Sequence, residues 1–267
     1  MAFGLKNAPA TFNRMMAKLL GHRDDVVYFF DDVLIFSDTW AEHIKSIREI
    51  LAIFVHNNLA IRPLKSEFGY FQVGFLGHLV GNGLLKPLPD NVSKILSIKI
   101  PKTKKQVRSI IGLINYYAKF MPDTAVSLIP LFKLTEKGMP DKVVWTDCCQ
   151  KALIDIQFRI NNNLKLFLPD ISKMFYVQTD SSLIGIGGVL LQSHNEHLRP
   201  CLFLSRKLLE RETRYSTIER ECLGLVWTLQ KLSRYLLQKR FILYTDHRPL
   251  VYMQKTGQLT AVSADGH

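Results

Sequence analysis

The chain has 267 residues, and its 35 Lys and Arg outnumber its 23 Asp and Glu, which gives a formal net charge of +12 at pH 7. Hydrophobic residues make up 47% of the sequence. This share excludes a largely disordered chain, and the length suits one large domain or about two to three small ones. The positive charge favours a polyanionic partner such as nucleic acid, although a basic protein without that partner would have the same composition.

The cysteines have no zinc or redox spacing. They are Cys148, Cys149, Cys201 and Cys222, and no two of them form a C-x-x-C pair. This usage suits a reducing compartment, the cytoplasm or the nucleus, better than a disulfide-stabilised secreted protein. The sequence shows no signal-peptide pattern, and no apolar run approaches the roughly 20 residues that a membrane-spanning helix needs.

Two elements are predicted near the start of the chain. Residues 9–20 have apolar side chains at the spacing of an amphipathic helix, with Pro9 in the first turn. In residues 26–37, β-forming side chains flank Asp31 and Asp32, which predicts a β-hairpin with the acidic pair at its tip. Carboxylates in an apolar run need compensation from water at an exposed turn or from metal ions, and the pattern leaves both open.

A capping box follows the hairpin. Thr39 and Glu42 have the spacing that opens a helix, and apolar residues at positions 44, 47, 51 and 54 would share one of its faces. Residues 68–85 are expected to form strands interrupted by glycines, namely Gly74, Gly77, Gly81 and Gly83.

A basic segment follows the boundary that Pro87 and Pro89 mark. Its lysines precede a helical pattern in residues 107–114, after which aromatic and basic residues alternate. An ordinary helix packed through its aromatic side chains would explain this pattern. An element that follows a nucleic-acid backbone, with lysines on phosphates, would explain it too. In that second interpretation the contacts come from Lys102, Lys104 and Lys105.

A second acidic group is spread along residues 175–246. Alternation from Phe175 predicts a strand that ends at Asp180, followed by a turn and a return strand whose glycines permit close backbone approach. Ser216 and Glu219 form another capping box, and Glu221 lies beside the apolar stripe at positions 218, 222, 225, 229, 232 and 236. Residues 241–245 are predicted to form a strand that leads into Asp246.

A sheet with a packed helix could bring Asp180, Glu221 and Asp246 together, or the three could be unrelated surface acids. Clustered carboxylates repel one another, so a cluster would require divalent cations. Hard, oxygen-liganded Mg²⁺ is the natural choice, with Mn²⁺ as a substitute. Two such ions could activate water and stabilise the leaving oxygen in phosphodiester cleavage.

The run Phe29-Phe30-Asp31-Asp32 resembles the catalytic hairpin of reverse transcriptases, although Phe29 stands where the family usually has Tyr. The run from Phe3 to Phe12 resembles the family's template- and nucleotide-contacting loop and helix, and residues 75–78 resemble its primer-gripping hairpin. The resemblance implies metal-binding roles for Asp31 and Asp32. It also implies nucleic-acid contacts for Phe3, Gly4, Leu5, Asn7, Pro9, Phe75, Leu76, Gly77 and His78.

Residues 179–188, 215–223 and 245–250 resemble the ribonuclease H domain of gypsy-type LTR retrotransposons, and residues 108–117 and 130–135 resemble their thumb and connection. The similarity spans residues 1–255 and suggests a fragment of a gypsy-type Pol polyprotein. It implies metal-ligand roles for Asp180, Glu221 and Asp246, and a non-ligand role for Glu219.

The implied fold class is α+β and α/β. We expect a partial reverse transcriptase palm in 1–86, a helical thumb and connection in 87–168, a truncated ribonuclease H-like mixed-sheet domain in 169–256, and an unassigned tail in 257–267. The palm's first aspartate and the fingers are missing from the pattern. The family's fourth ribonuclease H aspartate lies much further from Asp246 than Ala264-Asp265 does.

Metal-dependent hydrolysis of RNA in an RNA–DNA hybrid is therefore the chemistry expected to survive. Polymerisation belongs to the ancestry, but its site is incomplete in this sequence. The expected partners are a hybrid or a primer–template, together with the remainder of a Pol polyprotein. The alternative is a catalytically inactive remnant that binds nucleic acid through its basic surface, and a third hypothesis is the functionless product of a decaying element.

Overall fold

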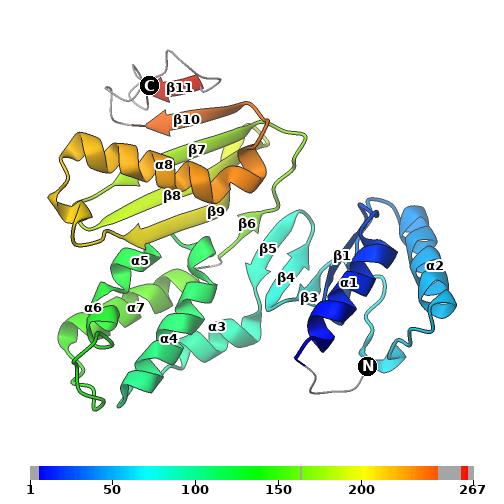
Figure 1. Cartoon of the computed structure of the whole chain (residues 1–267), viewed down its shortest axis with the longest axis horizontal. Helices are drawn as coiled ribbons and strands as arrows, with labels where there is room; N and C mark the ends of the chain where they lie inside the picture. Colours follow the sequence, from blue (N-terminus) through cyan, green and yellow to red (C-terminus); the bar gives the residue numbers. More distant parts are fainter. Residues whose placement is uncertain (1–5, 163, 246–259, 264–267) are drawn as a thin grey trace. The chain divides into compact units, whose positions relative to one another are not determined.

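The structure of the protein is a computed structural model that describes residues 6–162, 164–245 and 260–263, the last four by their backbone alone (Figure 1). The chain divides into two compact units, Met1–Leu76 and Gly77–His267. Within the described residues, no helix has both the length and the apolar character that crossing a membrane requires.

In the first unit, two helices and a hairpin share one small core. The helices are α1 (Ala8–Leu20) and α2 (Trp40–His56), and the hairpin consists of β1 (Val26–Phe29) and β2 (Asp32–Ile35). The predicted capping box of α2 is present, since Thr39 and Glu42 bond reciprocally. Apolar side chains from all these elements meet, with Met16, Leu20, Val26, Ile50 and Phe54 at the centre.

The end of the first unit differs from the prediction. After the short 3₁₀ helix η1 (Pro63–Lys65), residues 68–72 form no strand, and Gly74 lies inside β3 (Val73–Phe75) instead of interrupting it. The backbone turns at Gly69, where φ is +72° and an added Cβ would lie 3.1 Å from the Trp40 ring. A left-handed backbone under a tryptophan suits glycine alone, and it prevents this segment from continuing as a strand.

The second unit opens with a small antiparallel sheet. Strands β4 (His78–Gly81) and β5 (Leu84–Pro87) are joined by Asn82 and Gly83, and both joining residues have positive φ, as a two-residue hairpin loop favours. Strand β6 (Leu166–Phe167) pairs with β5.

A helical layer lies between β5 and β6 in the chain. It contains α3 (Pro89–Leu96), α4 (Lys104–Tyr116), η2 (Ala118–Phe120), α5 (Thr124–Ser127), α6 (Ile129–Lys133) and α7 (Asp147–Asn161). The apolar positions predicted for the basic helix are confirmed, because Val107, Ile110, Ile111 and Ile114 belong to the shared core. The helices thus form one packed layer.

The later described residues, 175–245 and 260–263, build a five-stranded mixed sheet and the helices that connect two of its strands. Its strands are β7 (Phe175–Ser181), β8 (Gly185–His194), β9 (His197–Lys207), β10 (Phe241–Thr245) and β11 (Thr260–Ser263). The order is β11-β10-β7-β8-β9: β7, β8 and β9 form an antiparallel meander, while β10 runs parallel to both β7 and β11. The 3₁₀ helix η3 (Glu212–Arg214) and helix α8 (Thr217–Leu236) follow β9, and α8 lies across one face of the sheet (Figure 1). The mixed sheet that the sequence predicted is present, and its strand β11 lies in the segment 257–267 that was expected to be an unassigned tail.

The buried face of α8 is rotated from the apolar stripe expected there. Ile218 is 49% exposed, and the buried line runs through Arg220, Glu221, Gly224, Thr228, Leu232 and Leu236. Small side chains explain the difference, because an added Cβ at Gly224 would lie 2.3 Å from Ser181 Oγ of β7. Close approach of helix and sheet therefore decides which face is buried, and it places Glu221 on the sheet-facing side.

Candidate functional site

The hairpin of the first unit presents Asp31 and Asp32 to solvent, as predicted. Phe29 pairs with Asp32, and Phe30 and Asp31 form the two-residue turn between them. Phe30 has a φ of +52°, a conformation that costs a bulky residue about 1–3 kcal/mol, and strain of this kind gathers at functional sites. Both carboxylates are exposed, so either water or metal ions can reach them to compensate their charge.

Asp180 lies near the end of β7, on the face of the sheet that points away from α8. Phe175, Val177 and Thr179 are buried in alternation, which confirms the predicted faces, although the strand continues to Ser181. Asp180 is exposed and pairs with Gly187 of β8.

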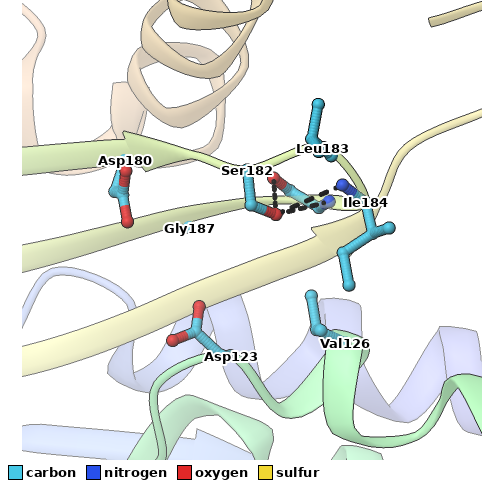
Figure 2. Close-up of a pocket in the computed structure, with 8 residues that line it drawn as sticks. Asp123, Val126, Asp180, Ser182, Leu183, Ile184 and Gly187 are labelled. Atoms are coloured by element: carbon cyan, nitrogen blue, oxygen red, sulfur yellow. Dashed lines mark hydrogen bonds between the residues drawn. The ribbon is translucent and has the colours of Figure 1, made fainter. Parts of the chain in front are cut away.

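Asp180 borders an open hollow of about 550 Å³ (Figure 2). One wall is the β7–β8 turn with the start of β8, and the other is the beginning of α5. The lining residues are Asp123, Val126, Asp180, Ser182, Leu183, Ile184, Gly185 and Gly187. The side chain of Asp180 is therefore accessible to a ligand in solution.

Glu221 reaches the same end of β7 from the other side of the sheet. Its side chain is buried, at 6% exposure, in the second turn of α8. Ser181, which follows Asp180, donates a hydrogen bond from its Oγ to the carbonyl of Arg220 at 3.1 Å. The residues next to Asp180 and Glu221 are thus bonded to each other, which fixes the spacing of the two backbones.

Glu219 has a different role on the same helix. Its carboxylate accepts hydrogen bonds from the Ser216 backbone N–H at 2.8 Å and from Ser216 Oγ at 2.9 Å, and the backbone bond lowers its pKa. The group caps α8, consistent with the non-ligand role that the resemblance implies.

The third predicted ligand, Asp246, lies outside the described residues. Strand β10 ends at Thr245 and runs parallel to β7, with Tyr244 opposite Gln178. Across the described ranges, no group of three or more His, Cys, Asp or Glu side chains is placed to hold a metal ion. The convergence of Asp180, Glu221 and Asp246 stays a prediction.

The predicted primer-gripping turn rests partly on buried contacts. Leu76 and Gly77 both have positive φ, and an added Cβ at Gly77 would lie 2.9 Å from Tyr116 Oη. Tyr117 donates a hydrogen bond to the Gly77 carbonyl at 3.0 Å. His78 is buried at 6% exposure among aromatic rings, so its side chain packs in the core instead of facing solvent.

The remaining predicted contacts near the N-terminus are only partly described. Asn7 is exposed at the N-cap of α1, and Pro9 is exposed in its first turn. Phe3, Gly4 and Leu5 lie outside the described residues.

The basic segment is joined to a second one that the sequence did not single out. Thr103 and Lys142 form an antiparallel bridge, and the Val143 backbone N–H donates to the Lys102 carbonyl at 3.0 Å. Lys104 is engaged inside the chain, since its Nζ donates to the carbonyls of Glu136 and Met139. Residues 99–142 hold nine Lys and Arg against three Asp and Glu.

The exposed cations of this region form what we term the basic surface: Lys102, Lys105, Arg108, Lys133, Lys137 and Lys142. Among the described residues, none of these six makes an ion pair with an acidic side chain. Their charges are therefore open to an external anion. Lys137 and Lys142 carried no signal in the sequence beyond the local lysine content.

The comparisons with known proteins agree with this architecture. Residues 1–80 match the family described as reverse transcriptase (RNA-dependent DNA polymerase), and residues 170–264 match the RNase H-like domain found in reverse transcriptase. Solved structures of the foamy viral protease-reverse transcriptase have the same fold. One in complex with dsDNA has a TM-score of 0.87 at 19% identity and covers all of this chain and 60% of that chain. One in complex with an RNA/DNA hybrid has a TM-score of 0.85 at 20% identity, with 100% and 39% coverage. The fold is therefore that of a reverse transcriptase joined to a ribonuclease H-like domain.

The sequence relatives are more specific. The chain is 37% identical over 259 residues to the retrovirus-related Pol polyprotein from transposon 297 of Drosophila melanogaster, covering 95% of this chain and 24% of that polyprotein. It is 32% identical over 256 residues to the transposon Tf2-3 polyprotein of Schizosaccharomyces pombe, with 94% and 19% coverage. The chain belongs to the retrotransposon Pol polyproteins and carries their reverse transcriptase and ribonuclease H-like domains. It spans about a quarter or less of these relatives' length.

Proposed function

We propose that the chain hydrolyses the RNA strand of an RNA–DNA hybrid. The observation that carries this proposal is the strand–helix contact at the end of β7, where the Ser181–Arg220 hydrogen bond fixes the backbones that bear Asp180 and Glu221. An accessible carboxylate and a buried carboxylate at one end of a sheet suit phosphodiester chemistry that depends on divalent ions.

Both matched families depend on divalent metal ions. The donor chemistry here fits Mg²⁺, because carboxylate oxygens are the hard ligands that it prefers. Asp180, Glu221 and Asp246 would hold it, with Mn²⁺ as a substitute. When bound, such ions supply positive charge against the charge that develops on the phosphodiester. Buried Glu221 contributes a carboxylate whose position is set by the packing of α8.

Nucleic-acid binding by the basic surface complements this chemistry. Its exposed cations can neutralise phosphates along a duplex, which supplies affinity without reading sequence. The partner that we propose is a hybrid or a primer–template, and the remainder of a Pol polyprotein is a further one. Asn7, Pro9 and the turn at Phe75–Gly77 would contact the same nucleic acid on the polymerase side, as would Phe3, Gly4 and Leu5, whereas the buried His78 would support that turn from within.

The test is cleavage of an end-labelled RNA–DNA hybrid in Mg²⁺. Asp180→Asn keeps the size of the side chain and removes its charge, so cleavage should fall by about 100-fold or more. Glu196→Gln is the matched control, because Glu196 is exposed at the far end of the β8–β9 hairpin and should leave the rate unchanged. Chelation by EDTA should abolish cleavage. Equal rates for the wild-type chain and Asp180→Asn would refute the proposal.

The second candidate is binding without catalysis, which the basic surface favours by itself. In that case the chain would hold the hybrid with a steep salt dependence and leave its RNA intact. Polymerisation is less supported, because Asp31 and Asp32 stand alone as exposed acids at a hairpin tip within the described residues. Primer extension that depends on Asp31 and Asp32 would restore it.

A further inference from the structure

The glycines of β8 allow α8 and the Asp123–Ser127 segment to approach the backbone of the sheet closely, one on each face. An added Cβ at Gly188 would lie 2.6 Å from Thr228 Cγ2 of α8. On the opposite face, a Cβ at Gly185 would lie 2.4 Å from Val126 Cγ2, and one at Gly187 would lie 3.2 Å from Asp123 Oδ1. The sheet is therefore held between α8 and the segment Asp123–Ser127, which contains α5.

A hydrogen bond fixes this segment to the sheet. The Ala125 backbone N–H donates to Ser205 Oγ at 3.1 Å, and Ser205 lies opposite Gly187 in the pairing of β8 and β9. Figure 2 shows Val126 and Asp123 facing the sheet across the hollow that Asp180 borders. The segment is thus the second wall of that hollow.

Val126 packs directly against Gly185, the residue that closes the turn after Asp180. The Ser182 backbone N–H donates to the Gly185 carbonyl at 2.9 Å, and the Gly185 N–H donates back to Ser182 Oγ at 3.0 Å. Val126 is a stiff, β-branched side chain, so it cannot easily swing away from Gly185. A displacement of Gly185 would pass through these bonds to Ser182, two residues from Asp180.

We propose that the Asp123–Ser127 segment, which lies outside the 170–264 family match, belongs to the working ribonuclease H-like unit. Val126 is a positioning residue: it holds the Ser182–Gly185 turn and thereby sets the position of the Asp180 carboxylate. The effect on cleavage rests on the proposed function, whereas the effect on the turn does not.

The test adds a methyl group at Gly185, where it would clash with Val126, and then shortens Val126 to relieve the clash. Gly185→Ala in the full chain should lower kcat for hybrid cleavage by about 10- to 100-fold, because small misplacements of catalytic groups are costly. The KM for the hybrid should stay unchanged. The double variant Gly185→Ala with Val126→Ala should recover most of the rate. Recovery will be incomplete, since the new Cβ also lies 3.1 Å from the Arg206 carbonyl oxygen.

Two further measurements separate positioning from general loss of stability. Ile156→Ala removes a buried side chain in α7 and should lower the melting temperature while leaving kcat of the folded chain unchanged. Amide hydrogen exchange at Ser182 and Gly185 should become faster in Gly185→Ala and return toward wild type in the double variant.

The outcomes distinguish this inference from the proposed function. An inactive wild-type chain would remove the proposed function, and exchange at the turn would then decide whether the segment holds it. Unchanged exchange in Gly185→Ala, or an unchanged kcat beside an active wild-type chain, would overturn the inference. The same loss of kcat in Ile156→Ala as in Gly185→Ala would also overturn it, because the effect would then follow stability alone.

Discussion

The two acidic regions of the chain, Asp31–Asp32 and Asp180 with Glu221, lie in very different structural surroundings. Asp31 lies in the exposed turn of a two-stranded hairpin and Asp32 is the first residue of the strand that follows, so both carboxylates face solvent. Asp180 and Glu221 come from a strand and a helix of a five-stranded sheet, and one of them is buried. The hairpin packs on α1 and α2 through its strands, but its tip extends beyond that core, whereas the end of β7 is covered by a helix that holds its side chains firmly.

This contrast shows in which of the two regions packing alone fixes the position of an acidic side chain. Glu221 is positioned by packing, and its carboxylate is costly to bury unless other groups compensate it. Asp31 and Asp32 carry no comparable constraint beyond the strained backbone at Phe30. Substitutions in the sheet and its covering helix should therefore lower the free energy of unfolding strongly, whereas substitutions at the hairpin tip should change it little.

The largest effect on stability should come from Arg206 in the sheet. Its guanidinium donates to both carboxylate oxygens of Glu212, at 2.6 and 3.1 Å, and lies 5.6 Å from the centre of the Trp227 ring. Glu212 is only 6% exposed, and the hydrogen bonds from Arg206 lower its pKa. Arg206→Ala would leave a buried carboxylate without its cation and should destabilise the fold by about 3 kcal/mol.

Denaturation in guanidinium chloride, followed by circular dichroism, measures this loss. Arg199→Ala is the matched control, because Arg199 is exposed on the same strand and should change stability by no more than about 0.5 kcal/mol. Equal destabilisation by the two variants would show that the Arg206–Glu212 pair does not support the sheet.

The sequence predicted the elements that have local signals. The capping boxes at Thr39 and Ser216 opened helices where expected, and the alternation from Phe175 identified the buried face of its strand. The apolar stripe of α8 was right at Leu232 and Leu236, which are buried, but Ile218 is exposed. Gly224 and Thr228 face the sheet instead, and this depends on side chains far away in sequence. Nothing local could show that Asp123 meets Gly187, or that Thr103 pairs with Lys142. The strand that bears Asp180 and the helix that bears Glu221 were thus predictable from the sequence, but the second wall of the hollow beside Asp180 was not.

The next effect concerns binding by the basic surface. Lys137→Gln with Lys142→Gln should weaken hybrid binding several-fold at low salt and reduce the slope of log affinity against log salt by up to about 2. Lys151→Gln with Lys231→Gln is the matched control, since both lysines are exposed on helices outside this surface. Fluorescence anisotropy at several salt concentrations gives both slopes. The basic surface would lose its proposed role if the control pair lowered affinity as much as the test pair.

A smaller effect should appear in the acid stability of the first unit. Hydrogen bonds from Arg23 lower the pKa of Asp25 to about 2, and Arg23 also binds Glu49 at 2.7 Å. Because the folded pKa lies below the unfolded value of about 3.9, this stability is present above about pH 4 and is lost as pH falls toward about 2. Arg23→Gln should flatten that loss, by less than about 1 kcal/mol since the pair is partly exposed.

Trp40 can report this change from within the first unit, in a chain whose Trp145 and Trp227 are replaced by Phe. Urea denaturation at neutral pH and at two acidic pH values would measure how the free energy of unfolding falls with pH. The measurement is made on a chain that retains Arg23 and on a chain with Arg23→Gln. An identical pH dependence in both chains would show that Arg23 does not lower the pKa of Asp25 and that the pair adds no pH-dependent stability.

The smallest effect should come from the hairpin tip itself. Asp31→Asn and Asp32→Asn change exposed side chains that make no ion pair among the described residues, so each should alter the free energy of unfolding by no more than about 0.5 kcal/mol. Glu221→Gln is the matched substitution in α8, which covers the sheet, and it should change stability more because its group is buried. Equal, near-zero effects at all three positions would mean that burial of Glu221 does not constrain the sheet, and the contrast between the two acidic regions would disappear.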